Sequence, residues 1–271
     1  HVRSILILLA ASIAIEVYTL CATTFLSVFK GDEIVAYFSN SAKAVEIMRT
    51  MIAAVCAVFL PRLNYYIGQR RIDDFNNLSI MGLRLLMSMS VPAAIILAVL
   101  APNFVLVLFG SAYLPSVTSM QILSLSVITV AISNFMGYQI LISLGKEKIV
   151  LYSTIIAALV NITLNLILIG PMGHNGAALA SVTAEAAVSL YQLHYVSKYV
   201  PLKYSSNTVC SIAVPAVAML GIMILLKMLN MNLYFEVIII TITGLLTYAF
   251  LGKLLYNEAV IIVSNKLSHS K

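Results

Sequence analysis

The chain has 271 residues, of which 61% belong to the set AVILMFWYC and only 10% are charged, and its mean hydropathy is +1.02. Water-soluble domains carry about 25% charged residues, so this composition excludes a soluble globular protein and indicates a chain embedded in lipid. The net charge of +6 is not accompanied by a basic patch interleaved with aromatic residues, and we therefore expect no nucleic-acid partner.

Apolar runs of roughly 20 residues, the length that crosses a bilayer as a helix, recur along the whole chain. They do not alternate polar with apolar residues as membrane strands do, so the fold class is all-α, with about eight transmembrane helices. The predicted spans are Ser4–Val28, Ile34–Leu60, Leu78–Leu100, Val117–Leu144, Ile149–Ile169, Ala177–Val196, Val209–Leu226 and Leu233–Leu251.

The basic residues predict the orientation of these spans. Twelve of the sixteen lie before the first span, at or near the even-numbered links or after the last span, whereas two, Lys30 and Lys227, lie at the odd-numbered links. Because cytoplasmic links are enriched in Lys and Arg, both ends of this chain are predicted to be cytoplasmic. The link Pro61–Asn77 is then the one substantial cytoplasmic loop between spans.

Ionisable residues inside the predicted spans are the candidate functional residues, since each costs roughly 2.5–3.5 kcal/mol at the bilayer centre. In the second span Lys43, Glu46 and Arg49 are three residues apart and share an arc of about 120° on one helix face. Two readings stay open: a ladder of charges that neutralise one another, or a cavity wall with a positive excess that binds a phosphate-bearing substrate. Arg84, near the cytoplasmic end of the third span, either joins this substrate site or extends to the headgroups as an anchor.

Glu16 and Glu185 lie near the middle of the first and sixth spans, with no obvious partner in their own helices. With Glu46 they are candidate ion-coupling residues for H⁺ or Na⁺, the alternative being protonated carboxyls that hydrogen-bond a neighbouring helix. Asn161 and Asn165, four residues apart, are expected to form hydrogen bonds that hold helices together.

No metal, cofactor or enzyme site is predicted. Cys21, Cys56 and Cys210 all lie within spans and form no CxxC pair, so they are expected to pack as small apolar residues. The motifs HExxH, GxSxG, GxGxxG and the Walker loop are absent from the sequence. We therefore expect a protein that is not an enzyme.

Seven strings, taken in order, resemble the polysaccharide flippases of the multidrug/oligosaccharidyl-lipid/polysaccharide exporter superfamily, over residues 5–204. They are IEVYTL around Glu16, AYFSNSAKAVEI from Ala36, LPRLNYY from Leu60, LFGSAYLPSV from Leu108, MGYQILISLGKEK from Met136, NITLNLILIGPMGHNGAALASVTAE from Asn161, and QLHYVSKY from Gln192. Relatives commonly carry an acidic residue shortly after the YTL string, where this sequence has Cys21, Ala22 and Thr23.

The resemblance implies two six-helix lobes, of which residues 1–204 would be the second, followed by two additional transmembrane helices and a cytoplasmic tail in residues 205–271. The first lobe would be missing, and the chain would be the C-terminal portion of a larger transporter. It also implies a role in a bacterial cytoplasmic membrane, where an undecaprenyl-pyrophosphate-linked oligosaccharide for O-antigen or capsule synthesis is moved by alternating access, with possible H⁺ or Na⁺ coupling. Lys43 and Arg49 would then hold the pyrophosphate.

Two other functions stay open. A multidrug or cation antiporter of the same superfamily would favour an acidic cavity, whereas the second span carries two basic residues and one acidic residue. A membrane glycosyltransferase or polymerase should have a sizeable external loop with charged catalytic residues. The longest external link, Ala101–Ser116, contains no charged residue.

Overall fold

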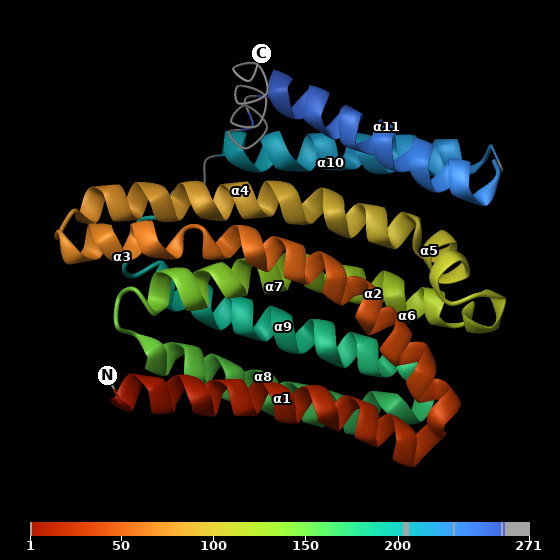
Figure 1. Ribbon diagram of the computed structural model, residues 1–271, viewed down its shortest axis with the longest axis horizontal. Helices are drawn as coiled ribbons and strands as arrows, with labels where there is room; N and C mark the ends of the chain where they lie inside the picture. The colour runs from red at the N-terminus through yellow and green to blue at the C-terminus, as the bar shows by residue number, and fades with distance from the viewer. Residues whose placement is uncertain (1, 203–205, 230, 256, 258–271) are drawn as a thin grey trace.

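The computed structural model describes residues 2–202, 206–229, 231–255 and 257, and these residues are almost entirely helical (Figure 1). The long helices are α1 (Val2–Lys30), α2 (Asp32–Ala57), α4 (Ile72–Val99), α8 (Glu147–Met172), α9 (His174–Val196), α10 (Ser206–Lys227) and α11 (Leu233–Leu254). The shorter ones are α3 (Leu60–Gly68), α5 (Ala101–Leu108), the 3₁₀ turn η1 (Ser111–Tyr113), α6 (Ser116–Ser124), α7 (Ser126–Asn134) and the π-helix η2 (Phe135–Leu141).

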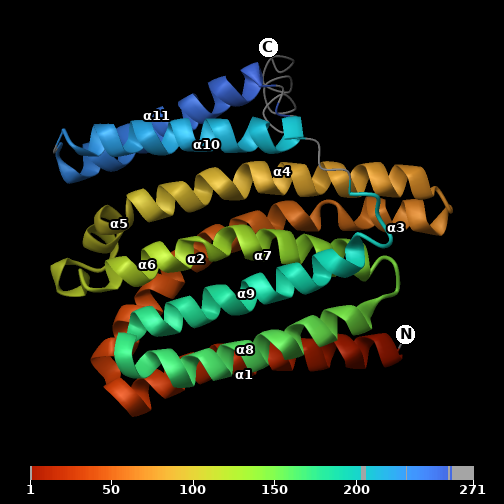
Figure 2. The ribbon, with the colours of Figure 1, turned by 180° about the vertical axis from the view of Figure 1, so that it is seen from behind.

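The long helices lie side by side, so that the molecule is a slab of roughly aligned rods (Figures 1 and 2). From one edge to the other, α1 packs on α8, α8 on α9, α9 on α6 and α7, α7 on α4, and α4 on the α10–α11 pair. The start of α1, the α3–α4 turn and the start of α8 lie at one end of the slab (Figure 1). The α1–α2 turn, α5 and the α10–α11 link lie at the other end (Figure 1).

All eight predicted spans are helical within the described residues. Seven helices are long and apolar enough to cross a bilayer, with α2–α3 and α6–η2 each counted as one span. Of the eight predicted spans, the one outside this group is α9, which packs on α7 and α8 within the slab. The chain is thus a multi-pass membrane protein.

The prediction of a loop at Pro61–Asn77 is wrong, because only residues 69–71 of this segment lie outside helices. Pro61 is at the start of α3, where a helix needs no amide donor and proline's fixed φ angle fits. Instead of ending the helix, Pro61 begins a short continuation of the α2 span, and Arg70, with a φ of 56°, makes the turn into α4.

Close packing holds the central helices together. A Cβ added at Gly82 of α4 would lie 2.2 Å from Cζ of Phe135, a ring that is fully buried and packs edge-on against Phe59 at 5.3 Å. On the outer faces, by contrast, large apolar side chains such as Leu159 and Val217 are exposed by 63% and 70%. In a bilayer these faces contact acyl chains, so exposure of an apolar side chain carries no penalty there.

Candidate functional site

A small cavity of about 80 Å³ lies where α1, α2, α6 and α9 meet. Its polar lining is formed by Tyr18 and Thr19 of α1, Arg49 of α2, and Ser181 and Glu185 of α9. Each of these helices is of spanning length, and all five residues lie well inside their helices. The structure therefore places a cation, a carboxyl group and three hydroxyls together, away from the ends of these helices.

The carboxyl group of Glu185 is held by a hydrogen bond from another helix. The Tyr18 hydroxyl donates to Oε1 of Glu185 over 3.1 Å, and these residues are 167 positions apart in the sequence. The Tyr18 ring is 8% exposed and packs with Ala157, Ala184 and Val188 at the junction of α1, α8 and α9. Because the ring is fixed by packing, its hydroxyl presents a pre-oriented donor to Glu185.

Arg49 connects this cavity to the neighbouring helices. Its Nη1 donates to Oε2 of Glu46 over 3.4 Å, and its Nη2 donates to the Ser126 hydroxyl of α7. Within the described residues, Nε of Arg49 is buried without a hydrogen-bond partner. The guanidinium group, on a side chain only 20% exposed, is therefore held between Glu46 and Ser126 and keeps one N–H donor unpaired within the described residues.

Lys43, Glu46 and Glu16 are exposed on the surface of the slab rather than buried in it. The Glu46 side chain is 61% exposed, and within the described residues Lys43 makes no ion pair. Ionised groups at half depth are disfavoured against acyl chains. This surface of α1 and α2 thus fits a water-filled space better than lipid.

The structure brings together some of the predicted site residues and separates others. Arg49 and Glu185 line one cavity, and Glu46 pairs with Arg49, but neither Lys43 nor Glu16 lines that cavity. Arg84 lies between α4 and α10, in a different part of the slab. The prediction that groups Arg84 with Lys43 and Arg49 is not matched by this arrangement, because α4 turns the Arg84 side chain towards α10.

Asn161 and Asn165 contact each other within α8. Nδ2 of Asn165 donates to Oδ1 of Asn161 over 2.7 Å, and both side chains are almost fully buried. In the described part of the chain, the Asn161 amide nitrogen and the Asn165 amide oxygen have no partner. The bond between two helices that the sequence suggested is thus replaced, in this structure, by a bond between two turns of one helix.

Tyr18 and Ser126 are the site residues that sequence reasoning missed. Both occur in apolar stretches, and a tyrosine or serine in a membrane helix carries no charge to attract attention. For Tyr18 the available signal was its position in the IEVYTL string, two residues after Glu16. Its partner on α9 depends on tertiary packing, which the sequence does not display.

A slab of membrane-length helices is the arrangement of a multi-pass membrane protein, and ionisable side chains within its spans are typical of functional sites in such proteins. The chain belongs to the family described as lipid II flippase MurJ, whose family model matches residues 2–244.

Comparison with individual proteins agrees with this family. The chain is 22% identical over 232 residues to a probable low-salt glycan biosynthesis flippase, Agl15, of Haloferax volcanii, an alignment that covers 85% of this chain and 49% of that protein. The chain thus spans about half the length of the curated relative it matches.

Solved structures show the same fold. A lipid II flippase MurJ in an inward closed conformation superposes with a TM-score of 0.80 at 18% identity, covering 92% of this chain and 53% of the other. An outward-facing multidrug resistance transporter of the MATE family gives a TM-score of 0.67 at 17% identity, covering 95% and 64%. The predicted MATE-like membrane fold is therefore confirmed.

Proposed function

We propose that this chain is the second lobe, residues 1–204, and the two additional helices, residues 205–271, of a flippase that moves a lipid-linked oligosaccharide across a bacterial cytoplasmic membrane. Two findings support this proposal: the chain belongs to the lipid II flippase family, and it covers about half the length of the relatives it matches. The first lobe would close the exposed polar surface of α1 and α2, and the two lobes would rock around the enclosed chamber in alternating access. Both ends of this chain would lie in the cytoplasm.

The observation that carries the proposal is the largely buried guanidinium group of Arg49 in the middle of α2, which lines the cavity with Glu185 and whose Nε has no hydrogen-bond partner within the described residues. Lys43 lies six residues earlier on the same helix, about 9 Å along its axis, and its exposed ammonium group adds a second positive charge to the α2 surface. Arginine is well suited to phosphate because its planar donors match two oxygens at once. The cargo is therefore proposed to carry a pyrophosphate, as an undecaprenyl-pyrophosphate-linked oligosaccharide does.

Ion coupling is proposed to act through Glu185. With Glu185 ionised, the charges of Lys43, Arg49, Glu46 and Glu185 sum to zero. Binding of H⁺ or Na⁺ at Glu185 would leave one positive charge and would free Arg49 from a competing carboxylate. The ionisation state of Glu185 would thus change the affinity of the site for an anionic cargo, and by reciprocity the cargo would change the affinity of Glu185 for the ion. Glu16 and Glu46 are proposed as secondary positions on the same water-filled surface.

The identity of the glycan is the finer part of the proposal. The family description names lipid II, and the Haloferax relative is named for glycan biosynthesis. We propose O-antigen or capsule repeat units as the cargo, on the resemblance of the seven sequence strings. The test is complementation of two strains, one depleted of its lipid II flippase and one lacking its repeat-unit flippase. If the protein restores growth of the first strain but not surface polysaccharide in the second, the cargo is lipid II.

A cation antiporter is the second candidate, favoured by the superposition on a multidrug transporter of the MATE family. An organic cation would have to bind beside Arg49 and Lys43, which repel it. The basic residues of the site therefore favour the anionic cargo. A membrane glycosyltransferase or polymerase finds no support in the family match.

The test is a charge-neutralised variant of the complete transporter that contains this chain. Lys43→Gln with Arg49→Gln should abolish surface polysaccharide while the amount of protein in the membrane is unchanged. The matched control, Lys146→Gln with Lys198→Gln, removes the same charge at the slab's end, where these lysines lie over tyrosine rings, and should transport normally. Wild-type polysaccharide in the first variant would refute the cationic site.

A further inference from the structure

The junction between α4 and α10 is closed at one end and open at the other. At the closed end, Nζ of Lys227 donates to the Val99 carbonyl over 2.6 Å, and Met219 and Met223 are fully buried beside α4 and α11. Towards the start of α10, the same two helices separate around a groove. The α10–α11 pair is thus packed against α4 at the Lys227 end, and further along α4 Ser88 contacts Tyr248 of α11 and Asn257 beside the groove.

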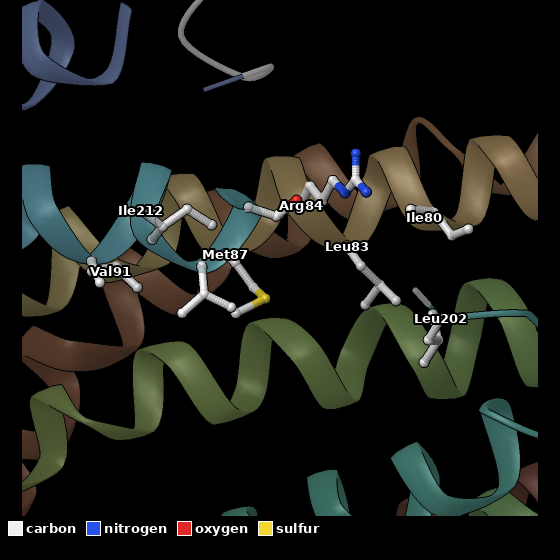
Figure 3. A pocket seen from close by; sticks show the side chains of 10 residues that line it. Ile80, Leu83, Arg84, Met87, Val91, Leu202 and Ile212 are labelled. Atoms are coloured by element: carbon white, nitrogen blue, oxygen red, sulfur yellow. The ribbon is translucent and has the colours of Figure 1, made fainter. Parts of the chain in front are cut away.

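The groove has an apolar half of about 280 Å³. Its lining includes Leu83, Met87 and Val91 of α4, Leu202 of the segment before α10, and Ile212 of α10. Figure 3 shows Leu83, Met87 and Leu202 on one side of α4, while the guanidinium group of Arg84 extends to the opposite side. The methylene stem of Arg84 therefore borders the apolar half, and its charge lies away from it.

A polar half of about 300 Å³ adjoins it, sharing Arg84, Thr208 and Ile212 with the apolar half. Ser211 and Asn257 also line this half, and Nδ2 of Asn257 donates to the Ser211 carbonyl over 3.0 Å. A cation and several hydrogen-bonding groups therefore lie directly beside an apolar trough. This half is at the end of the slab where the basic residues gather.

We propose that this groove binds one phospholipid with an anionic headgroup, whose phosphate contacts Arg84 and whose acyl chain lies along Leu83, Met87 and Val91. The division into a basic polar half and an apolar half matches the two parts of such a lipid, and basic pockets between transmembrane helices are a recurrent site for anionic headgroups. The groove lies between α4 and α10, apart from the Arg49 cavity, so the bound lipid is separate from the transported cargo. It would complete the open end of the α4–α10 junction.

Photoaffinity labelling tests this site directly. The protein is reconstituted in vesicles of phosphatidylcholine that contain, in separate samples, equal amounts of diazirine-bearing phosphatidylglycerol or phosphatidylcholine, and the labelled residues are mapped by mass spectrometry. Phosphatidylglycerol should label residues 80–91 and 208–213 severalfold more than phosphatidylcholine does. Arg84→Gln should lower that labelling by about tenfold, because it removes one charge-assisted hydrogen bond, and Arg84→Lys should retain most of it.

Two further variants separate a bound lipid from a general surface effect. Ala213→Phe should reduce labelling by both lipids, since it fills the apolar half and leaves the charge intact. Arg62→Gln removes an exposed arginine at the same end of the slab, outside the groove, and should change nothing. Equal labelling by the two lipids in the wild-type protein, or unchanged labelling in Ala213→Phe, would overturn the proposal, and neither result depends on whether the flippase assignment holds.

Discussion

The contact between Tyr18 and Glu185 predicts a measurable coupling between α1 and α9. Tyr18→Phe removes only the hydroxyl that donates over 3.1 Å and leaves the buried ring in place. A hydrogen bond to a charged group contributes about 1.5–3 kcal/mol and one between neutral groups about 0.5–1.5 kcal/mol. Because Gln keeps an acceptor oxygen, the cycle with Glu185→Gln measures the charge-dependent part of the bond, and the double variant Tyr18→Phe with Glu185→Gln should be more stable than the sum of the single variants by about 1 kcal/mol.

The measurement is a double-mutant cycle from reversible unfolding of the protein in mixed micelles. Tyr248→Phe provides a matched control, since that hydroxyl is also buried but contacts Ser88 of α4, on the other side of the slab, at 3.2 Å. Its effect should add to that of Glu185→Gln within about 0.5 kcal/mol. If the effects of Tyr18→Phe and Glu185→Gln are also additive, the hydrogen bond has no energetic coupling to the Glu185 carboxylate. The claim that Tyr18 is a pre-oriented donor to Glu185 would then be refuted.

Two further variants test packing in the slab. Gly82→Ala should lower the free energy of unfolding by about 1–3 kcal/mol, because its Cβ would overlap the Phe135 ring, whereas Gly221→Ala, with no atom within 4 Å, should be neutral or stabilising. Equal melting temperatures for both variants would contradict the close packing. Asn165→Leu should cost about 1–3 kcal/mol by leaving Oδ1 of Asn161 without its donor, and replacing both asparagines by Leu should restore much of that loss. A double variant that melts below Asn165→Leu would contradict the pairing.

The fold could largely be predicted from the sequence, because a segment that crosses lipid must satisfy its backbone hydrogen bonds internally and therefore forms a continuous helix. Such a helix is recognised in the sequence as a long apolar run. The Glu46–Arg49 pair was equally accessible, since i and i+3 positions are neighbours on any helix. Depth in the membrane can be inferred in the same way. The lateral position of a helix cannot, and it is lateral position that separates Arg84 from Arg49.

Pairs that join distant helices were also beyond sequence reasoning. The sequence marks Glu185 as a carboxyl group inside a span that needs a partner, but Tyr18 is one of fourteen tyrosines, and its place in the IEVYTL string does not connect it with Glu185. The helical continuation after Pro61 was missed for a different reason. A proline can end one helix or begin the next, and the backbone of its neighbours decides which.

The central claim is that the charged surface of α1 and α2 borders water at half depth. It is tested most directly by labelling single cysteines, in a variant whose native cysteines are replaced, with a membrane-impermeant thiol reagent. Lys43→Cys and Glu16→Cys should react, whereas Leu159→Cys and Leu166→Cys, at positions equally exposed on the outer face of α8, should not. If all four positions resist the reagent alike, α1 and α2 face acyl chains, and the proposed transport chamber does not exist.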